Sequence, residues 1–122
     1  MSPAFRSLMW YLLAGTRGGP NRRRILEQLH DGPANAHQLA TELDLDYRTV
    51  RHHLLLLEKN GAIARPLPDA YAPPYELAPY LAAHFEIVAE LGRATRRPAV
   101  PTARRAPIAT PTDPALRRGA AG

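Results

Sequence analysis

The chain has 122 residues, a formal net charge of +5 and no cysteine. This length provides one small domain, and the lack of cysteine excludes disulfides, thiolate metal sites and cysteine nucleophiles. The charge is uneven, because residues 95–122 contain six arginines and one acidic residue, whereas residues 1–94 contain ten basic and ten acidic residues. The high isoelectric point therefore comes from the C-terminal tail and is no evidence that the folded part binds nucleic acid.

The first predicted helix covers residues 3–14. Its apolar residues recur at helical spacing, and Trp10 and Tyr11 widen the apolar surface beyond one stripe. The apolar run at 8–14 is too short to span a bilayer, and no signal-peptide cleavage pattern accompanies it. We therefore expect a cytoplasmic protein without a membrane segment. The glycine-rich stretch 15–20 is expected to end the helix and form a loop.

A second helix is predicted over residues 21–30, with three residues facing the core: Ile25, Leu26 and Leu29. Three arginines at 22–24 crowd its first turn, where positive charge opposes the helix dipole. Two interpretations stay open for these side chains, which either contact DNA phosphates or point into water. We include Arg22 among the candidate phosphate contacts.

The central stretch runs from Asn35 to Gly61 and predicts two helices joined by a tight turn. Asn35, followed three residues later by Gln38, is a capping-box signature for the first of these helices. The turn is placed at 44–45. Asp46 is the expected N-cap of the second helix, and Gly61 is expected to follow its end.

The second helix of this pair has two different faces. Its aliphatic residues recur at i, i+4 and i+7 on one stripe: Val50, Leu54 and Leu57. Basic or hydrogen-bonding residues occupy the opposite side and the flanks: Arg48, Thr49, Arg51, His52 and Lys59. Such a helix suits the major groove, because its polar side can meet base edges and phosphates while its apolar side holds it to the first helix. The alternative is an ordinary amphipathic hairpin with a solvated polar face.

Two short strands are predicted next, at residues 62–65 and 71–77, around a proline-rich turn. Helix, turn, helix and then a small hairpin is the order of a winged helix-turn-helix. The predicted fold is therefore mostly α with a small β-hairpin wing (α+β). Pro73 and Pro74 remove two ladder donors, so the second strand should be short or irregular.

A last helix is predicted from Pro79, a residue suited to the first helical position, to about residue 93. Two apolar rows run side by side along it, whereas a single core face needs only one: Leu81, Phe85 and Val88, and Tyr80, His84, Ile87 and Leu91. The surplus favours a homodimer formed through residues 3–14 and 79–93. The alternative is that the two terminal helices pack on each other within one chain.

Three motifs combine in this chain: Gly15-Thr16-Arg17-Gly18-Gly19 with Asn21-Arg22, Gln38-Leu39-Ala40, and LDLDYRTVRHHLLLLEKNG at 43–61. Together they resemble the archaeal winged helix-turn-helix transcription regulators of the ArsR-like group, over about residues 10–77. The resemblance implies a DNA-binding domain, usually dimeric, that acts on transcription. It places five residues at recognition-helix positions that face DNA: Tyr47, Arg48, Thr49, Arg51 and His52. It also places His53 where related proteins have a histidine packed beneath the wing.

The wing departs from this group, because related wings often carry a Tyr-Gly step where this chain has Tyr71-Ala72-Pro73-Pro74-Tyr75. This departure argues against minor-groove contact by the wing. Catalytic signatures are also missing, since the sequence has no nucleophile elbow, phosphate-binding glycine loop or His-Glu-x-x-His helix. His52 and His53 point about 100° apart on a helix and cannot easily share one ion. We expect no enzymatic activity, no metal and no cofactor.

We predict a transcription regulator that binds double-stranded DNA as a homodimer through a recognition helix at residues 46–60. Residues 1–94 form the winged domain, and 95–122 form a basic, disordered tail rich in proline, alanine and arginine. The DNA contacts are assigned to Tyr47, Arg48, Thr49, Arg51, His52, Lys59 and Arg22. Two alternatives stay open. The apolar pair Leu55-Leu56, off the core stripe, favours a module that docks on another protein, and the tail allows RNA binding.

Overall fold

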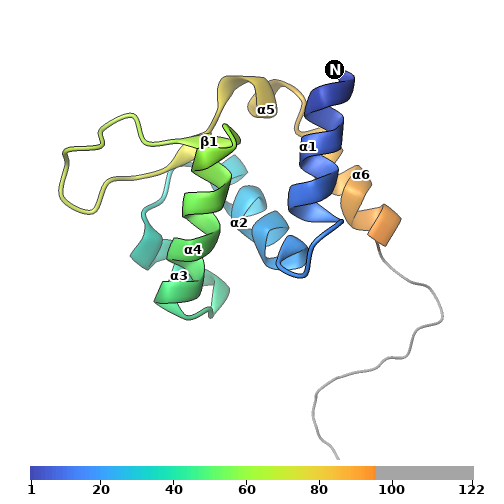
Figure 1. Ribbon diagram of the computed structural model, residues 1–122. Coiled ribbons are helices and arrows are strands. Elements are labelled where there is room, and N and C mark those ends of the chain that lie inside the picture. Colours follow the sequence, from blue (N-terminus) through green and yellow to red (C-terminus); the bar gives the residue numbers. More distant parts are fainter. Residues whose placement is uncertain (96–122) are drawn as a thin grey trace, which may run out of the picture.

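The fold is mostly helical, with one two-stranded antiparallel hairpin (Figure 1). The computed structural model describes residues 1–95, so the predicted tail, beyond its first residue, lies outside the described residues. The elements follow one another as α1 (Pro3–Leu13), α2 (Gly19–Asp31), α3 (Ala36–Leu43), α4 (Tyr47–Lys59), β1 (Ile63–Ala64), β2 (Glu76–Leu77), α5 (Pro79–Ala83) and α6 (Glu86–Thr95). The predicted winged helix-turn-helix fold is confirmed. None of these described helices is long and apolar enough to cross a membrane.

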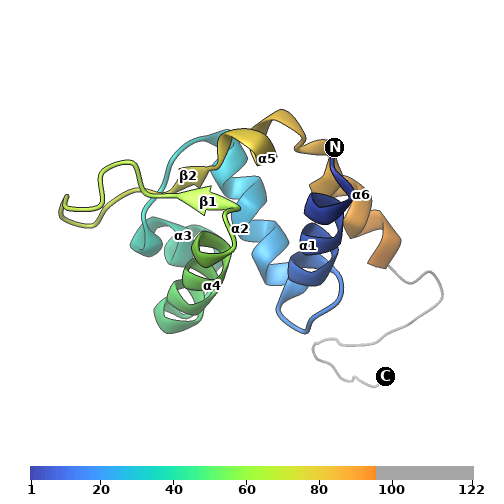
Figure 2. The ribbon, with the colours of Figure 1, turned by 45° about the horizontal axis from the view of Figure 1, so that its top comes forward.

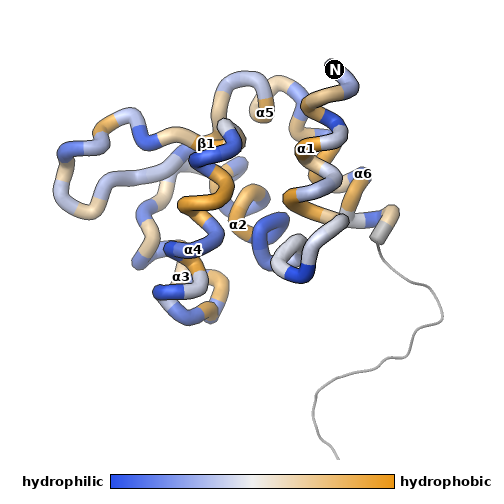
Figure 3. The backbone as a smooth tube through the Cα atoms, in the orientation of Figure 1, coloured by the Kyte–Doolittle hydropathy of each residue, from blue (hydrophilic) through white to orange (hydrophobic). Residues whose placement is uncertain are grey.

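One hydrophobic core joins the helices. Apolar residues at helical spacing on α1, α2, α4 and α6 turn toward one another, and Figure 3 shows apolar stretches on these helices. The largest fully buried side chains are Met9, Leu12, Leu13, Ile25, Leu26, Leu39, Leu54, Leu57, Leu81, Ile87, Val50 and Val88. The predicted inner stripe of α4 is among them. The polar side of α4 is therefore turned outward from this core.

The start of α2 differs from the sequence prediction. The helix begins at Gly19 rather than at residue 21, and Pro20 lies inside its first turn, where its missing N–H costs nothing. A Cβ atom built on Gly19 would lie 2.4 Å from the carbonyl oxygen of Leu13. Only a glycine lets the start of α2 approach the end of α1 this closely, so the loop between them is short and tight.

The predicted helix over residues 79–93 is wrong as a single helix. His84 has φ −126° and ψ 37°, which interrupts the helix and separates α5 from α6. The break turns residues from both predicted rows inward, and Leu81, Ile87 and Val88 are fully buried within the chain. In both ribbon views α6 lies beside α1 (Figures 1 and 2). The terminal helices thus pack on each other within one chain.

The wing is short, as the prolines predict. Ile63 pairs with Leu77 and Ala64 with Glu76 in an antiparallel register. A third segment joins this sheet, because Ala34, just before α3, exchanges two backbone hydrogen bonds with Tyr75 at 3.2 and 2.8 Å. No local sequence pattern marks this bridge. It ties the base of the wing to the start of α3, while the wing loop projects outward on the side of α3 and α4 (Figures 1 and 2).

Candidate nucleic-acid interface

The turn between α3 and α4 is fixed by side-chain caps. The predicted capping box is present, since the Asn35 side chain accepts from the Gln38 N–H at 2.9 Å and the Gln38 side chain accepts from the Asn35 N–H at 2.8 Å. Asp44 takes the left-handed conformation at φ 55°, which ends α3. Asp46 Oδ2 then accepts from the backbone N–H groups of Arg48 and Thr49 at 3.0 and 3.2 Å. These bonds set the angle at which α4 leaves the turn.

The outer face of α4 carries the predicted contact residues. Its inner stripe of Val50, Leu54 and Leu57 is fully buried. Six of the predicted residues are exposed along the rest of the helix: Tyr47, Arg48, Thr49, Arg51, His52 and Lys59. Three of these side chains carry a positive charge at neutral pH, and the acid that caps this helix lies at its start. The exposed side of α4 therefore presents donors to an anionic partner.

Tyr47 organises the first turn of this face. Its ring stacks on His37 of α3, with centroids 4.3 Å apart and planes 16° from parallel. Its hydroxyl oxygen accepts a hydrogen bond from Arg51 Nη1 at 3.2 Å. This bond raises the pKa of Arg51 above its ordinary value, so the guanidinium keeps its charge while it is held in place. His37 was not among the predicted contact residues, because only the folded structure brings its ring against Tyr47.

Arg22 does not lie where a phosphate contact requires. Its side chain is 4% exposed and reaches inward from α2. The guanidinium donates to the Leu12 carbonyl oxygen at 2.7 Å, to His53 Nδ1 at 3.1 Å and to Thr16 Oγ1. Arg22 is therefore placed neither to contact DNA phosphates nor to point into water, the two interpretations that the sequence left open. We leave it out of the interface and assign it a structural role.

His53 is the partner of Arg22 on α4. It is 6% exposed, which agrees with the structural role implied by the family resemblance. Its hydrogen-bond partner, however, is Arg22 of α2 rather than a wing residue. Burial lowers the pKa of His53, and the charges of Arg22 and then of His52 lower it further. The ring is therefore held neutral, and it accepts at Nδ1 with its own proton on Nε2.

The end of α4 is closed by a Schellman motif. The Ala62 N–H donates to the Leu57 carbonyl at 2.9 Å and the Gly61 N–H to the Glu58 carbonyl at 3.0 Å. Gly61 has φ 79°, as the predicted terminator requires. Lys59 is exposed in the last turn, where a cation interacts favourably with the negative end of the helix dipole.

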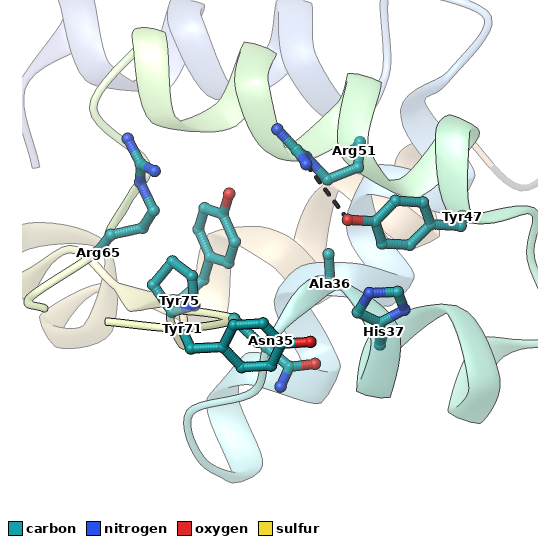
Figure 4. Close-up of a pocket in the computed structure, with 10 residues that line it drawn as sticks. Asn35, Ala36, His37, Tyr47, Arg51, Arg65, Tyr71 and Tyr75 are labelled. Atoms are coloured by element: carbon teal, nitrogen blue, oxygen red, sulfur yellow. Dashed lines mark hydrogen bonds between the residues drawn. The ribbon is translucent and has the colours of Figure 1, made fainter. Parts of the chain in front are cut away.

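The base of the wing adds a cation that is not among the predicted contact residues. Arg65 follows β1 and donates from Nε to Glu58 Oε2 at 2.9 Å. Its guanidinium also lies 5.9 Å from the ring centre of Tyr75. A signal for it exists, since Arg65 is the first basic residue after α4, at the position where a wing begins. Arg65 and Arg51 flank a hollow between the wing and α4 (Figure 4).

Comparisons with known proteins agree with this geometry. Residues 18–66 match the family described as a helix-turn-helix domain. The fold is similar to that of a probable transcriptional regulator from Pseudomonas aeruginosa, with a TM-score of 0.55 and 23% identity over 75% of this chain and 74% of that one. It is also similar to quinone-bound YodB from B. subtilis, with a TM-score of 0.53 and 21% identity over 77% and 96% of the two chains. A search of curated proteins finds no match.

Proposed function

Because the chain carries a winged helix-turn-helix domain of the ArsR-like transcription-regulator type, we propose that it controls transcription by reading duplex DNA with α4. The observation that carries this proposal is the outward placement of Arg48, Arg51 and His52 on a helix whose other side is fixed in the core. The family points to a regulator rather than an enzyme. The two similar structures described above come from bacteria, so an archaeal affiliation stays a prediction, as does a cytoplasmic location.

The exposed residues of α4 have different expected roles. Arg48, Arg51 and His52 reach base edges or neighbouring phosphates in the major groove. Tyr47 and Thr49, in the first turn of α4, contact the sugar-phosphate backbone. Lys59, at the opposite end, adds a phosphate contact. This division places the base contacts in the N-terminal half of α4, the part of a recognition helix that meets base edges in helix-turn-helix proteins.

Gel shifts at several salt concentrations test these roles on duplex sites selected from a random pool. If Arg48 binds guanine through two hydrogen bonds, Arg48→Ala should weaken binding to the selected site by ~1–3 kcal/mol and relax the preference for one base. Lys59→Ala should leave sequence preference unchanged and lower the salt slope by about one unit. Arg17→Ala is a matched control, because Arg17 is exposed in the loop between α1 and α2, outside α4 and outside the segments 3–14 and 79–93. The assignment is wrong if Arg48→Ala behaves like the control.

The active form is proposed to be a homodimer that uses residues 3–14 and 79–93. Much of the apolar surface in these segments is buried within the chain, which leaves three exposed rings to support the proposal: Trp10 (55% exposed), Tyr11 (50%) and Tyr80 (44%). Light scattering of the full chain measures its mass directly. Trp10→Ser with Tyr11→Ser should convert a dimer into a folded monomer with weaker DNA binding, and a monomeric wild-type chain on DNA would contradict the proposal.

A second candidate function is docking on another protein, and Leu55 favours it. This side chain lies on α4 outside the core stripe and is 54% exposed. Leu55→Ser should abolish a protein contact, whereas it should leave major-groove binding by the arginines intact. A pull-down that recovers a stable protein partner while retaining no DNA at physiological salt would favour docking over the main proposal.

A further inference from the structure

A pocket lies between the wing, the start of α3 and the first half of α4 (Figure 4). Its volume is about 270 Å³. Tyr47 and Arg51 reach it from α4, His37 from α3, and Arg65, Tyr71 and Tyr75 from the wing. The bridge between Ala34 and Tyr75 fixes the wing base to α3, so the floor of the pocket is held by backbone hydrogen bonds.

The walls of this pocket are aromatic. Tyr75 is buried at its base, and the ring of Tyr47 is braced by its stack on His37. Tyr71 is fully exposed at the rim. Ala72, which follows it, has φ 48°, an uncommon conformation for a residue with a side chain. Such conformations persist where the surrounding structure holds them, and they concentrate at binding sites.

Two guanidinium groups face the same space. Arg51 donates from one terminal nitrogen to the Tyr47 hydroxyl, and Arg65 uses its Nε for Glu58. A guanidinium has five N–H donors, so each arginine keeps further donors for a ligand. Planar guanidinium groups bind carboxylates through paired hydrogen bonds. The pocket thus combines donors for an anion with flat apolar faces for a ring.

We propose that this pocket binds a small planar aromatic carboxylate, with its ring against the tyrosines and its charge on Arg51 and Arg65. A pocket of about 270 Å³ is larger than a single phosphate group needs. The effector role rests on the proposed function: the bound ligand and the duplex exclude each other. Both use Tyr47 and Arg51, so the bound acid acts as an effector that releases the duplex.

Binding is tested first without DNA, by calorimetry of the full chain with 2-naphthoate. The neutral 2-naphthamide should bind about tenfold more weakly or not at all, because it lacks the charge that the arginines recognise. Tyr71→Ala, at a fully exposed position that leaves folding unchanged, should weaken 2-naphthoate binding. Arg65→Gln combined with Glu58→Gln keeps the net charge and should lower affinity by about tenfold, as expected for a lost charge-assisted hydrogen bond. Arg17→Gln is the control, because Arg17 is exposed in the loop between α1 and α2 and does not line the pocket, and it should bind like the wild type.

The pocket assignment is overturned if millimolar 2-naphthoate gives no binding, or if the Tyr71 and Arg65 variants bind it as the wild type does. Weakened duplex binding by the Arg65 variant without any 2-naphthoate binding would identify a DNA phosphate contact instead. Competition is then measured by anisotropy of a labelled duplex, which 2-naphthoate should displace from the wild type. Simultaneous binding of both would overturn the effector role. A chain that binds 2-naphthoate but no duplex would refute the proposed function alone.

Discussion

The buried position of His53 predicts that mild acidification lowers the free energy of unfolding. The ring is buried on α4, and its Nδ1 accepts a hydrogen bond from Arg22 at 3.1 Å. Protonation of Nδ1 removes that acceptor and places a second cation against the buried guanidinium. Burial, the charge of Arg22 and then that of His52 all lower the pKa of His53 below its ordinary value of 6.5. Folding therefore opposes proton uptake at this site.

The sign and the size follow from proton linkage. Well above pH 6.5 the ring is neutral in both the folded and the unfolded chain, so this site takes nothing from the free energy of unfolding. Below that value the unfolded chain binds a proton that the folded chain excludes, so the free energy of unfolding falls until the lowered folded pKa is reached. Each pH unit in this window removes about 1.4 kcal/mol from the free energy of unfolding.

Urea denaturation across this pH window measures the effect, with two single variants for comparison. In His53→Gln the amide oxygen still accepts from Arg22 but has no proton to gain, so the slope with pH should flatten. His52→Gln changes the exposed neighbour and should keep most of the wild-type slope. If His53→Gln loses stability with falling pH as steeply as the wild type does, another group titrates and the reasoning is refuted.

Four further substitutions test the stability of the fold. Arg22→Met should lower the free energy of unfolding by about 2–3 kcal/mol in thermal denaturation, since three hydrogen bonds of about 1 kcal/mol each are lost, and should leave the salt slope of DNA binding unchanged. Asp46→Ala should cost about 1 kcal/mol in urea denaturation through the lost N-cap, and an unchanged midpoint would contradict that. Gly61→Ala should cost roughly 1 kcal/mol from its positive φ alone, because its Cβ would meet nothing within 4 Å. Gly19→Ala should cost more than Gly61→Ala in the same assay, because its Cβ would strike the Leu13 carbonyl.

The parts of the fold that the sequence predicted correctly depend on local rules. The capping box at Asn35, the N-cap at Asp46 and the terminator at Gly61 are each decided within four residues of the helix end that they form. The inner stripe of α4 follows from one period of the helix. Such signals do not depend on where the rest of the chain lies. The helix-turn-helix, and the exposed face that it presents, were therefore predictable.

The parts that were missed depend on contacts between distant residues. The bonds of Arg22 to Leu12 and His53 cross 10 and 31 positions, so no local pattern marks the side chain as buried. The interruption at His84 lies within an apolar periodicity that runs unbroken through the sequence, and Leu81 before the break and Ile87 and Val88 after it are all buried in the core. The pairing of Ala34 with Tyr75 joins a segment before α3 to the wing, and neither residue signals it alone.

Two sets of contacts on α4 make its position sensitive to charge. On the inner side His53 connects α4 to Arg22, and Arg22 also holds Leu12 of α1 and Thr16 of the following loop. Space for this connection depends on Gly18, since a Cβ there would lie 2.7 Å from the His53 ring. On the outer side the exposed arginines of α4 meet the proposed duplex. Both sets act on one rigid helix. A proton on His53 removes the hydrogen bond from Arg22 that helps to hold α4 in place, so mild acid should weaken DNA binding before the chain unfolds.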